Sequence, residues 1–346
     1  MTEPTNSRRS PLLRRIALTL LLLFLALLVA GFLYENISEA RDRRFNAMPG
    51  QRVIINAADG SAFHMHIHCI GEGAPTVVLD SGLGDSYISW RKVQPQIAAF
   101  TRVCSYDRAG IAFSDASPRV RTSQVIAEEL HALLHNAGVT PPYVLVGHSM
   151  GGYDVRVFAH QYANEVAGMA LIDASHPDQE QRLPPELKDM QGGWLHEAEF
   201  LAYTTPFGIP RLMGFCDEDP TIRAADCNFH TARESIAEMK AFRESASQTA
   251  ASGTLGDLPL VVLSHDPDKP SSELPPDLAK PTNEAWEKMQ EELAHLSTRG
   301  RQSIVKGSAH YIQIDRPDAV VAAIRDVVGQ GRQSQTPQDS SQQPMR

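Results

Sequence analysis

Short apolar runs and longer amphipathic stretches follow one another along most of the chain. Apolar runs of four to seven residues, and one that alternates over eight, predict strands at 52–56, 62–69, 76–80, 102–106, 143–146, 168–173, 258–264 and 302–307. Apolar residues at helical spacing predict helices at 86–100, 122–138, 153–162, 283–297 and 315–328. This order predicts an α/β fold with a mostly parallel sheet of about eight strands and helices on both faces.

The strand–helix order stops between roughly His176 and Gly256, where helical periodicity is visible only around Glu199 and from Ala232 to Glu244. A connection of this length is too long for an ordinary loop between two strands. We therefore predict a core of residues 51–175 and 257–329, with 176–256 inserted as a helical lid over the carboxyl edge of the sheet, where such sheets bind ligands. The Gln-, Ser- and Pro-rich residues 330–346 are predicted to be a disordered tail.

The first fifty residues have a different pattern. Ile16–Tyr34 carries no charge and would span about 28 Å as a helix, which predicts a transmembrane signal-anchor. Residues 1–15, which contain four arginines, are predicted to be cytoplasmic, and residues 35–50 are predicted to be a charged stalk. The catalytic domain is then expected on the extracytoplasmic side, periplasmic or extracellular. The alternative is a signal peptide cleaved after the weak site Val29-Ala30-Gly31.

The chain has four cysteines, and an extracytoplasmic location permits disulfides. Cys216 and Cys227 close a short loop in an irregular stretch and are the natural pair. Cys69 and Cys104 lie in predicted strands, so they are either a second disulfide or two buried thiols.

Composition and charge limit the kinds of molecule that the protein can be expected to bind. A formal net charge of −9, with 42% hydrophobic and 21% charged residues, is typical of a globular protein and argues against nucleic-acid binding. His64, His66 and His68 share one face of a strand, which we interpret as its polar side and not as a metal site. Trp286 begins an apolar helical stripe that predicts core packing. We expect no metal and no cofactor, and the sequence leaves the oligomeric state open.

Four segments carry the candidate chemistry. Gly147-His148-Ser149-Met150-Gly151 joins a predicted strand to a predicted helix. The others are "DSGLG" at 80–84, "YDRAGIAFSD" at 106–115 and "GSAHYIQID" at 307–315. In this order they resemble the nucleophile elbow, the oxyanion loop, the segment after the fourth strand and the histidine loop of the α/β-hydrolase family. The resemblance covers residues 52–329 and is closest to membrane-anchored bacterial hydrolases of the serine type.

The resemblance implies Ser149 as nucleophile and His310 as the general base that removes its proton. His148, next to the serine on a tight turn, is expected to shape the pocket. Backbone N–H groups of Met150 and Leu83 are implied as the oxyanion hole, because negative charge on the substrate oxygen needs donors already aimed at it.

The acid of the triad has two candidate positions. Members of the family usually carry it after the strand that follows the lid, which here offers Asp266 or Asp268, but the usual glycine of that turn is absent. Other members carry it one strand earlier, where Asp173 ends a strand and Asp178 follows. We favour Asp173 and keep Asp268 as the alternative acid. Either aspartate could instead simply cap a turn.

These residues together predict a serine hydrolase that cleaves carboxylic esters through an acyl-enzyme on Ser149. Serine at this position argues against haloalkane dehalogenase and epoxide hydrolase activities, which use an aspartate nucleophile on this fold. Acyltransferase, thioesterase and peptidase activities use the same residues and stay open. The alternative from another class is a non-catalytic, membrane-tethered ligand-binding protein. The predicted partners are a small-molecule ester and the membrane.

Overall fold

The computed structural model describes residues 11–45, 47–56, 60–269 and 274–335. Its centre is one sheet of eight strands in the order β1-β2-β4-β3-β5-β6-β7-β8. Only the pairings of β1 with β2 and of β2 with β4 are antiparallel. The strands are β1 Gln51–Asn56, β2 Ala62–Ile70, β3 Thr76–Asp80, β4 Val103–Tyr106, β5 Tyr143–His148, β6 Val166–Ile172, β7 Leu260–Ser264 and β8 Gly300–Ile304. The predicted mostly parallel sheet is confirmed.

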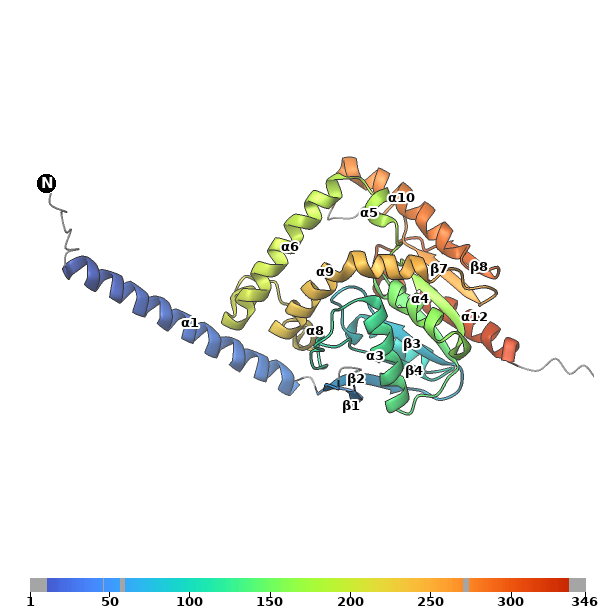
Figure 1. The fold of residues 1–346 in the computed structure, drawn as a ribbon, viewed down its shortest axis with the longest axis horizontal. Coiled ribbons are helices and arrows are strands. Elements are labelled where there is room, and N and C mark those ends of the chain that lie inside the picture. Colours follow the sequence, from blue (N-terminus) through green and yellow to red (C-terminus); the bar gives the residue numbers. More distant parts are fainter. Residues whose placement is uncertain (1–10, 46, 57–59, 270–273, 336–346) are drawn as a thin grey trace, which may run out of the picture.

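Helices cover both faces of this sheet (Figure 1). The core helices are α2 Gln94–Ile97, α3 Ser123–Asn136, α4 Gly151–Gln161, α10 Pro276–Ala294, α11 Ile312–Asp315 and α12 Pro317–Gln335, with the 3₁₀ turns η1 Tyr87–Trp90 and η2 Ala163–Glu165. Apolar residues of α3, α4 and α10 pack on one face, and those of η1, α2, α11 and α12 pack on the other. The parallel strands are buried on both faces, which is why they read as unbroken apolar runs.

Residues 176–256, which we call the cap segment, form a layer of helices at one edge of the sheet (Figure 1). They are α5 Gln179–Arg182, α6 Glu186–Thr204, η3 Thr205–Phe207, α7 Ile209–Leu212, α8 Pro220–Asp226 and α9 Phe229–Ala251. Helix α9 packs against α3, α4 and α6. Asn228 caps its first turn by accepting from the Thr231 N–H at 2.9 Å, which fixes where this helix begins.

A single helix, α1 Pro11–Phe45, contains the long apolar run and projects from the rest of the molecule (Figure 1). By length and composition it could cross a membrane, and its most apolar window is not buried in the protein. The predicted stalk, 35–50, is helical as far as Phe45, so it continues the same helix instead of forming a separate linker. Of the basic N-terminal segment, residues 1–10 lie outside the described residues.

Several predicted elements have other bounds in the structure; α10, for example, begins at Pro276 and not at residue 283. Two further predictions are wrong in kind. The helix predicted at 86–100 is broken into η1 and α2, because Pro95 stands at the start of α2. The disorder predicted from residue 330 is wrong for 330–335, since α12 continues to Gln335. Arg332 holds this end by donating to the Ala74 and Phe100 carbonyls at 2.8 and 3.0 Å. Residues 336–346 lie outside the described residues.

All four cysteines are paired. Cys69 and Cys104 face each other across β2 and β4 and form a disulfide, so the alternative of two buried thiols is wrong. Cys216 and Cys227 form the second disulfide, as predicted, within the cap segment.

The three histidines of β2 do not form a uniform polar face. His66 is fully buried because both its ring nitrogens have partners, Asp107 Oδ2 at 2.7 Å and the Pro49 carbonyl at 2.6 Å. His64 pairs instead with Asp115 at 3.2 Å at the surface. Within the described part of the chain, no three His, Cys, Asp or Glu side chains are grouped to hold a metal ion.

Candidate active site

Ser149 lies on the turn between β5 and α4, at the carboxyl edge of the sheet. Its φ of +50° is in the left-handed region, which a residue with a side chain rarely adopts. The turn is so tight that a Cβ on Gly147 would lie 2.5 Å from the Gly151 carbonyl oxygen. A Cβ on Gly151 would lie equally close to the Ser81 carbonyl oxygen. The two glycines therefore allow the backbone segments around Ser149 to approach one another closely.

Asp173 and His310 meet at the same edge. Asp173 directly follows β6, and its Oδ2 is 2.6 Å from His310 Nδ1, which lies in the loop after β8. Since the carboxylate accepts this hydrogen bond, Nδ1 carries the proton and Nε2 is the ring nitrogen with the free lone pair. Asp173 is fully buried, whereas the His310 side chain is 42% exposed. A buried carboxylate thus orients a partly exposed imidazole.

The alternative acid is held elsewhere. Asp268 is 84% exposed and pairs with Lys306 Nζ at 2.9 Å. Asp266 pairs with the same lysine at 3.0 Å and accepts from the Gly307 N–H at 2.8 Å. Both carboxylates therefore stabilise the turns after β7 and β8, and the hydrogen bond to His310 comes from Asp173.

Asp173 has two further partners that sequence reasoning missed. His265 Nδ1 lies 3.0 Å from both carboxylate oxygens, and the His265 backbone N–H also donates to Oδ1 at 3.0 Å. Trp286 Nε1 donates to Oδ1 at 2.9 Å. The expectation that Trp286 only packs in the core is wrong, because its indole N–H reaches the site from the middle of α10. The one sequence signal was the position of His265 directly after a strand end.

The charge of Asp173 is compensated by these donors. Burial opposes ionisation, but hydrogen bonds from His265 and His310 outweigh it and hold the pKa of Asp173 well below its ordinary value. In return, although burial opposes it, the bond to Asp173 raises the pKa of His265. Asp173 is therefore held as an anion beside the His310 ring.

His148, next to the serine in sequence, is buried beneath the histidine loop. Its Nε2 is 3.1 Å from the His310 carbonyl oxygen, and the two rings are 4.7 Å apart. Burial, followed by the nearby His310, lowers the pKa of His148 to about 3. A neutral His148 can therefore donate to the backbone of His310 and fix the loop that carries it, in keeping with the expected shaping role.

Leu83 and Met150, the two residues expected to supply oxyanion donors, belong to one small apolar cluster with Tyr153. Met150 caps the N-terminus of α4, where backbone N–H groups point outward. Leu83 lies in the loop after β3, in which the Asp85 N–H donates to the Gly82 carbonyl at 3.1 Å. The structure thus brings the two backbone segments together beside Ser149.

A buried ionic cluster holds the Leu83 loop. Arg108 donates to the Ser81 carbonyl at 2.8 Å and to the Gly82 carbonyl, and it pairs with Asp80 at 2.9 Å. Its other partner is Glu238 of α9, at 2.7 Å, and this carboxylate also accepts from the Gly84 N–H at 2.9 Å. Arg108 and Glu238 are both almost fully buried.

Ser149 and His310 open into one cavity of about 420 Å³ between the core and the cap segment. Its lining is mostly apolar, with Leu83, Leu195, Met239, Phe242 and Trp286. Five polar residues complete the lining: Ser149, Ser175, Gln179, Glu180 and His310. A cavity of this size and character suits a small ligand with an apolar part.

The family follows from comparison with known proteins. A model described as the alpha/beta hydrolase family matches residues 77–323, which is most of the chain. The chain therefore belongs to the alpha/beta hydrolase family. The fold predicted from the resemblance is confirmed.

The chain is also similar to individual proteins. The uncharacterized protein YqjL of Bacillus subtilis (strain 168) is 28% identical over 270 residues, covering 78% of this chain and 89% of its own length. A thermophilic esterase from Thermogutta terrifontis has a TM-score of 0.59 at 24% identity, covering 82% of this chain and 99% of its own. A bromoperoxidase from Bacillus anthracis has a TM-score of 0.58 at 16% identity, covering 81% and 100%. At these identities the solved structures show the shared fold.

Proposed function

We propose that this α/β-hydrolase is a serine carboxylic-ester hydrolase in which Ser149, His310 and Asp173 form the catalytic triad. The observation that carries the proposal is the 2.6 Å hydrogen bond from His310 to a buried Asp173, with Ser149 and His310 lining one apolar cavity. The same fold in a solved esterase supports hydrolase chemistry without specifying the substrate.

The proposed reaction uses each group at a stated atom. His310 Nε2 accepts the Ser149 hydroxyl proton as Oγ attacks the ester carbon, and Asp173 stabilises the imidazolium formed. The Met150 and Leu83 N–H groups donate to the developing oxyanion. His310 then protonates the leaving alcohol, and water hydrolyses the acyl-enzyme by the reverse proton transfers.

The apolar wall of the cavity favours the acyl or alcohol part of an ester over a charged ligand. Phe242 and Met239 from α9 and Leu195 from α6 all come from the cap segment, which supports a lid role for it. We further propose that α1 is retained as a signal-anchor with its N-terminus in the cytoplasm, so that the hydrolase domain is extracytoplasmic. Two disulfides are consistent with such a compartment.

The test is covalent labelling with a fluorophosphonate and turnover of p-nitrophenyl esters of rising acyl length. Ser149→Ala should abolish both, while circular dichroism and the unfolding temperature stay those of the parent. Ser175→Ala is the matched control, because Ser175 lines the same cavity and should label normally.

Two outcomes would overturn the proposal. If Ser149→Ala keeps ester turnover, the nucleophile is another residue. If the parent is folded but neither labels nor turns over any ester, the non-catalytic ligand-binding alternative takes its place.

A further inference from the structure

The cap segment contacts α1 at the end of the apolar run and along the turns that follow it. A Cβ on Gly31 would lie 2.6 Å from the Phe207 carbonyl oxygen of η3, so the two backbones are in direct contact. One turn further, the Tyr34 ring packs on Gly208. Gly31 lies three residues before the end of the run at Tyr34, or about 4.5 Å along the helix axis. If the run lies in the hydrocarbon core of a membrane, η3 lies at the boundary between that core and the lipid headgroups.

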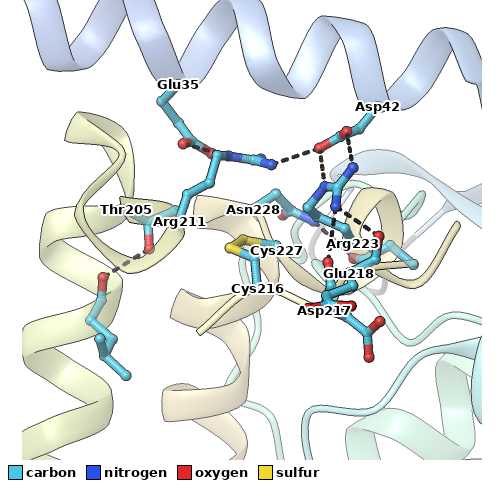
Figure 2. The surroundings of a disulfide bond; sticks show 12 residues. Glu35, Asp42, Thr205, Arg211, Cys216, Asp217, Glu218, Arg223, Cys227 and Asn228 are labelled. Carbon is cyan, nitrogen blue, oxygen red and sulfur yellow. Dashed lines mark hydrogen bonds and ion pairs between the residues drawn. A yellow bond between two sulfur atoms is a disulfide. The ribbon is translucent and has the colours of Figure 1, made fainter. Parts of the chain in front are cut away.

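Ion pairs fix the rotation of α1 about its axis and its position along the cap segment. Glu35 and Asp42, two turns apart, point from α1 towards the cap segment (Figure 2). Arg211 bonds Glu35 at 3.0 Å and Asp42 at 2.8 Å, and Arg223 bonds Asp42 at 3.0 Å. Glu35 and Asp42 are only 5% and 4% exposed. If the run lies in the hydrocarbon, Glu35 directly follows it and its ion pair lies at the membrane–water boundary. The ion pairs also keep the cap segment from sliding along α1.

Apolar side chains are exposed around this contact. Five large ones, each more than half exposed, lie within α6, α7 and the residues just after α7: Phe200, Tyr203, Leu212, Met213 and Phe215. We call these five the cap patch. Single exposed apolar residues are ordinary on a protein surface, but five within sixteen residues, in the elements that contact α1 or adjoin them, make this surface a candidate interaction site. Aromatic residues in such a group are typical of the bilayer interface.

We propose that the cap patch inserts into the headgroup and acyl-chain boundary of the membrane leaflet from which α1 emerges. The inference rests on the proposed retention of α1 as an anchor. Its own support is the contact of Gly31 with η3, which places the cap patch at the end of the apolar run. The occupant is therefore the lipid of the membrane that α1 spans, and its two parts, chain ends and headgroups, match the apolar cap patch and the charged pairs beside it.

The test measures the depth of an introduced indole in the full-length chain. Met213→Trp places the probe in the cap patch, and Ile304→Trp places a matched probe on β8, at the edge of the sheet opposite β1. Each variant is reconstituted in phosphatidylcholine nanodiscs, with and without bromine on the acyl chains. Bromine should remove most of the fluorescence added by Met213→Trp and none of that added by Ile304→Trp. The parent chain supplies the background of its own tryptophans.

A second measurement needs no substitution. Phosphatidylcholine with a diazirine on its acyl chain is photolysed in nanodiscs with the parent chain, and labelled peptides are mapped by mass spectrometry. We expect label on the peptide with residues 212–215 and on the apolar run, and none on β8.

The outcomes separate the cap patch from the anchor. If the chain is intact by mass and stays in the membrane after alkaline carbonate, but neither method detects lipid at the cap patch, the inference is overturned and the anchor stands. If residues 1–31 are missing from the purified chain, the anchor proposal fails and the inference fails with it. If the cap patch is shielded by a second copy, seen as a dimer in the nanodisc, the inference is likewise overturned.

Discussion

The acid side and the oxyanion side of the site are held by different parts of the chain. Asp173, His310, His265 and Trp286 all come from the core and from elements of the sheet's second half. The Leu83 loop instead depends on Glu238, which the cap segment contributes through α9. One half of the proposed catalytic apparatus is therefore complete without the cap segment, and the other half is not.

This difference has a chemical side. Donors around Asp173 hold its pKa below the ordinary value, so the acid side is stabilised as a charged group. Around the Leu83 loop the opposite holds, because burial raises the pKa of Asp80 and of Asp85 to about 6. The oxyanion side therefore depends on a cap residue and on carboxyl groups that burial disfavours as anions. We expect changes on the acid side to reduce catalysis without releasing the cap segment, and changes on the oxyanion side to weaken the attachment of the cap segment as well.

The largest effect should come from the acid itself. Asp173→Asn keeps the shape but removes the charge that stabilises the imidazolium, and it allows the wrong tautomer of His310. We expect kcat for a p-nitrophenyl ester to fall about 10⁴-fold with little change in KM. Asp268→Asn, the matched variant of the exposed aspartate on Lys306, should change kcat less than two-fold, roughly the effect of an ordinary surface site. The opposite ranking would assign the acid to Asp268.

The sequence was enough for the fold and for much of this site. Ser149 and His310 were predicted from local motifs, each within a few residues of a strand end. Asp173 and Asp268 both follow strands, so their order along the chain could not choose between them. The two aspartates are distinguished only by their positions in the folded protein. The left-handed backbone of Asp173, with φ of +44°, brings its carboxylate to His310.

Contacts with the cap segment were not predictable in this way. Arg108 and Glu238 are 130 residues apart, and α9 shows no pattern that distinguishes Glu238 from its other acidic residues. Trp286 failed for another reason. It shares a helical stripe with Met289 and Leu293, which are buried. Periodicity predicts which face of a helix is buried, but it does not predict that one residue of that face reaches the site.

The second prediction tests the oxyanion side. Glu238→Gln removes the charge that pairs with Arg108 inside the protein. The amide oxygen replaces only one of the two carboxylate oxygens, so either Arg108 Nε or the Arg108 Nη2 and Gly84 pair of donors faces an NH2 group. Breaking a buried ion pair should reduce the free energy of unfolding by roughly 3–5 kcal/mol. The looser Leu83 loop should also lower kcat by about 10²-fold, the scale of one lost oxyanion donor.

Glu244→Gln, an exposed change on the same helix, is the control and should leave both quantities unchanged. Unfolding by urea in detergent and ester turnover measure the two effects. Normal stability in Glu238→Gln would show that the cap segment does not hold the loop, and the comparison between the two sides would fail.

The third prediction returns to the acid side. His265→Ala removes a side-chain donor that reaches both oxygens of Asp173, while the His265 backbone N–H and the Trp286 indole remain. With its orientation less constrained, Asp173 should hold His310 less well, and kcat should fall about ten-fold. KM should not change, because His265 does not line the cavity. Rescue by His265→Gln, which keeps a donor, separates positioning of Asp173 from a general loss of packing. An equal fall in both variants would contradict the role.

The smallest effect concerns pH and the contact between the cap segment and the core. Ser86, just after the Leu83 loop, donates to Asp226 Oδ1 of α8 at 2.7 Å. Desolvation at this contact, with the nearby charges of Asp85 and Asp107, raises the pKa of Asp226 to about 7, against an ordinary value of 3.8. Asp226 is itself exposed to solvent, which screens these charges and limits their effect on stability. Between these pH values the folded protein binds the proton more tightly than the unfolded chain, so the contribution of Asp226 to stability falls as pH rises from about 4 to about 7.

Asp226→Asn should remove this slope. The amide still accepts from Ser86 but cannot ionise, so the variant should equal the parent near pH 4.5 and unfold at a temperature a few degrees higher at pH 8, about the shift expected for one kcal/mol or less in a chain of this size. Thermal unfolding at the two pH values, with the exposed Asp257→Asn as control, measures the difference. A variant that is less stable than the parent at pH 8 would mean that Asp226 is ionised and favourable in the folded protein. The oxyanion side would then resemble the acid side, because both would stabilise their carboxylates as anions. Only the segments that supply the partners of these carboxylates would distinguish the two sides.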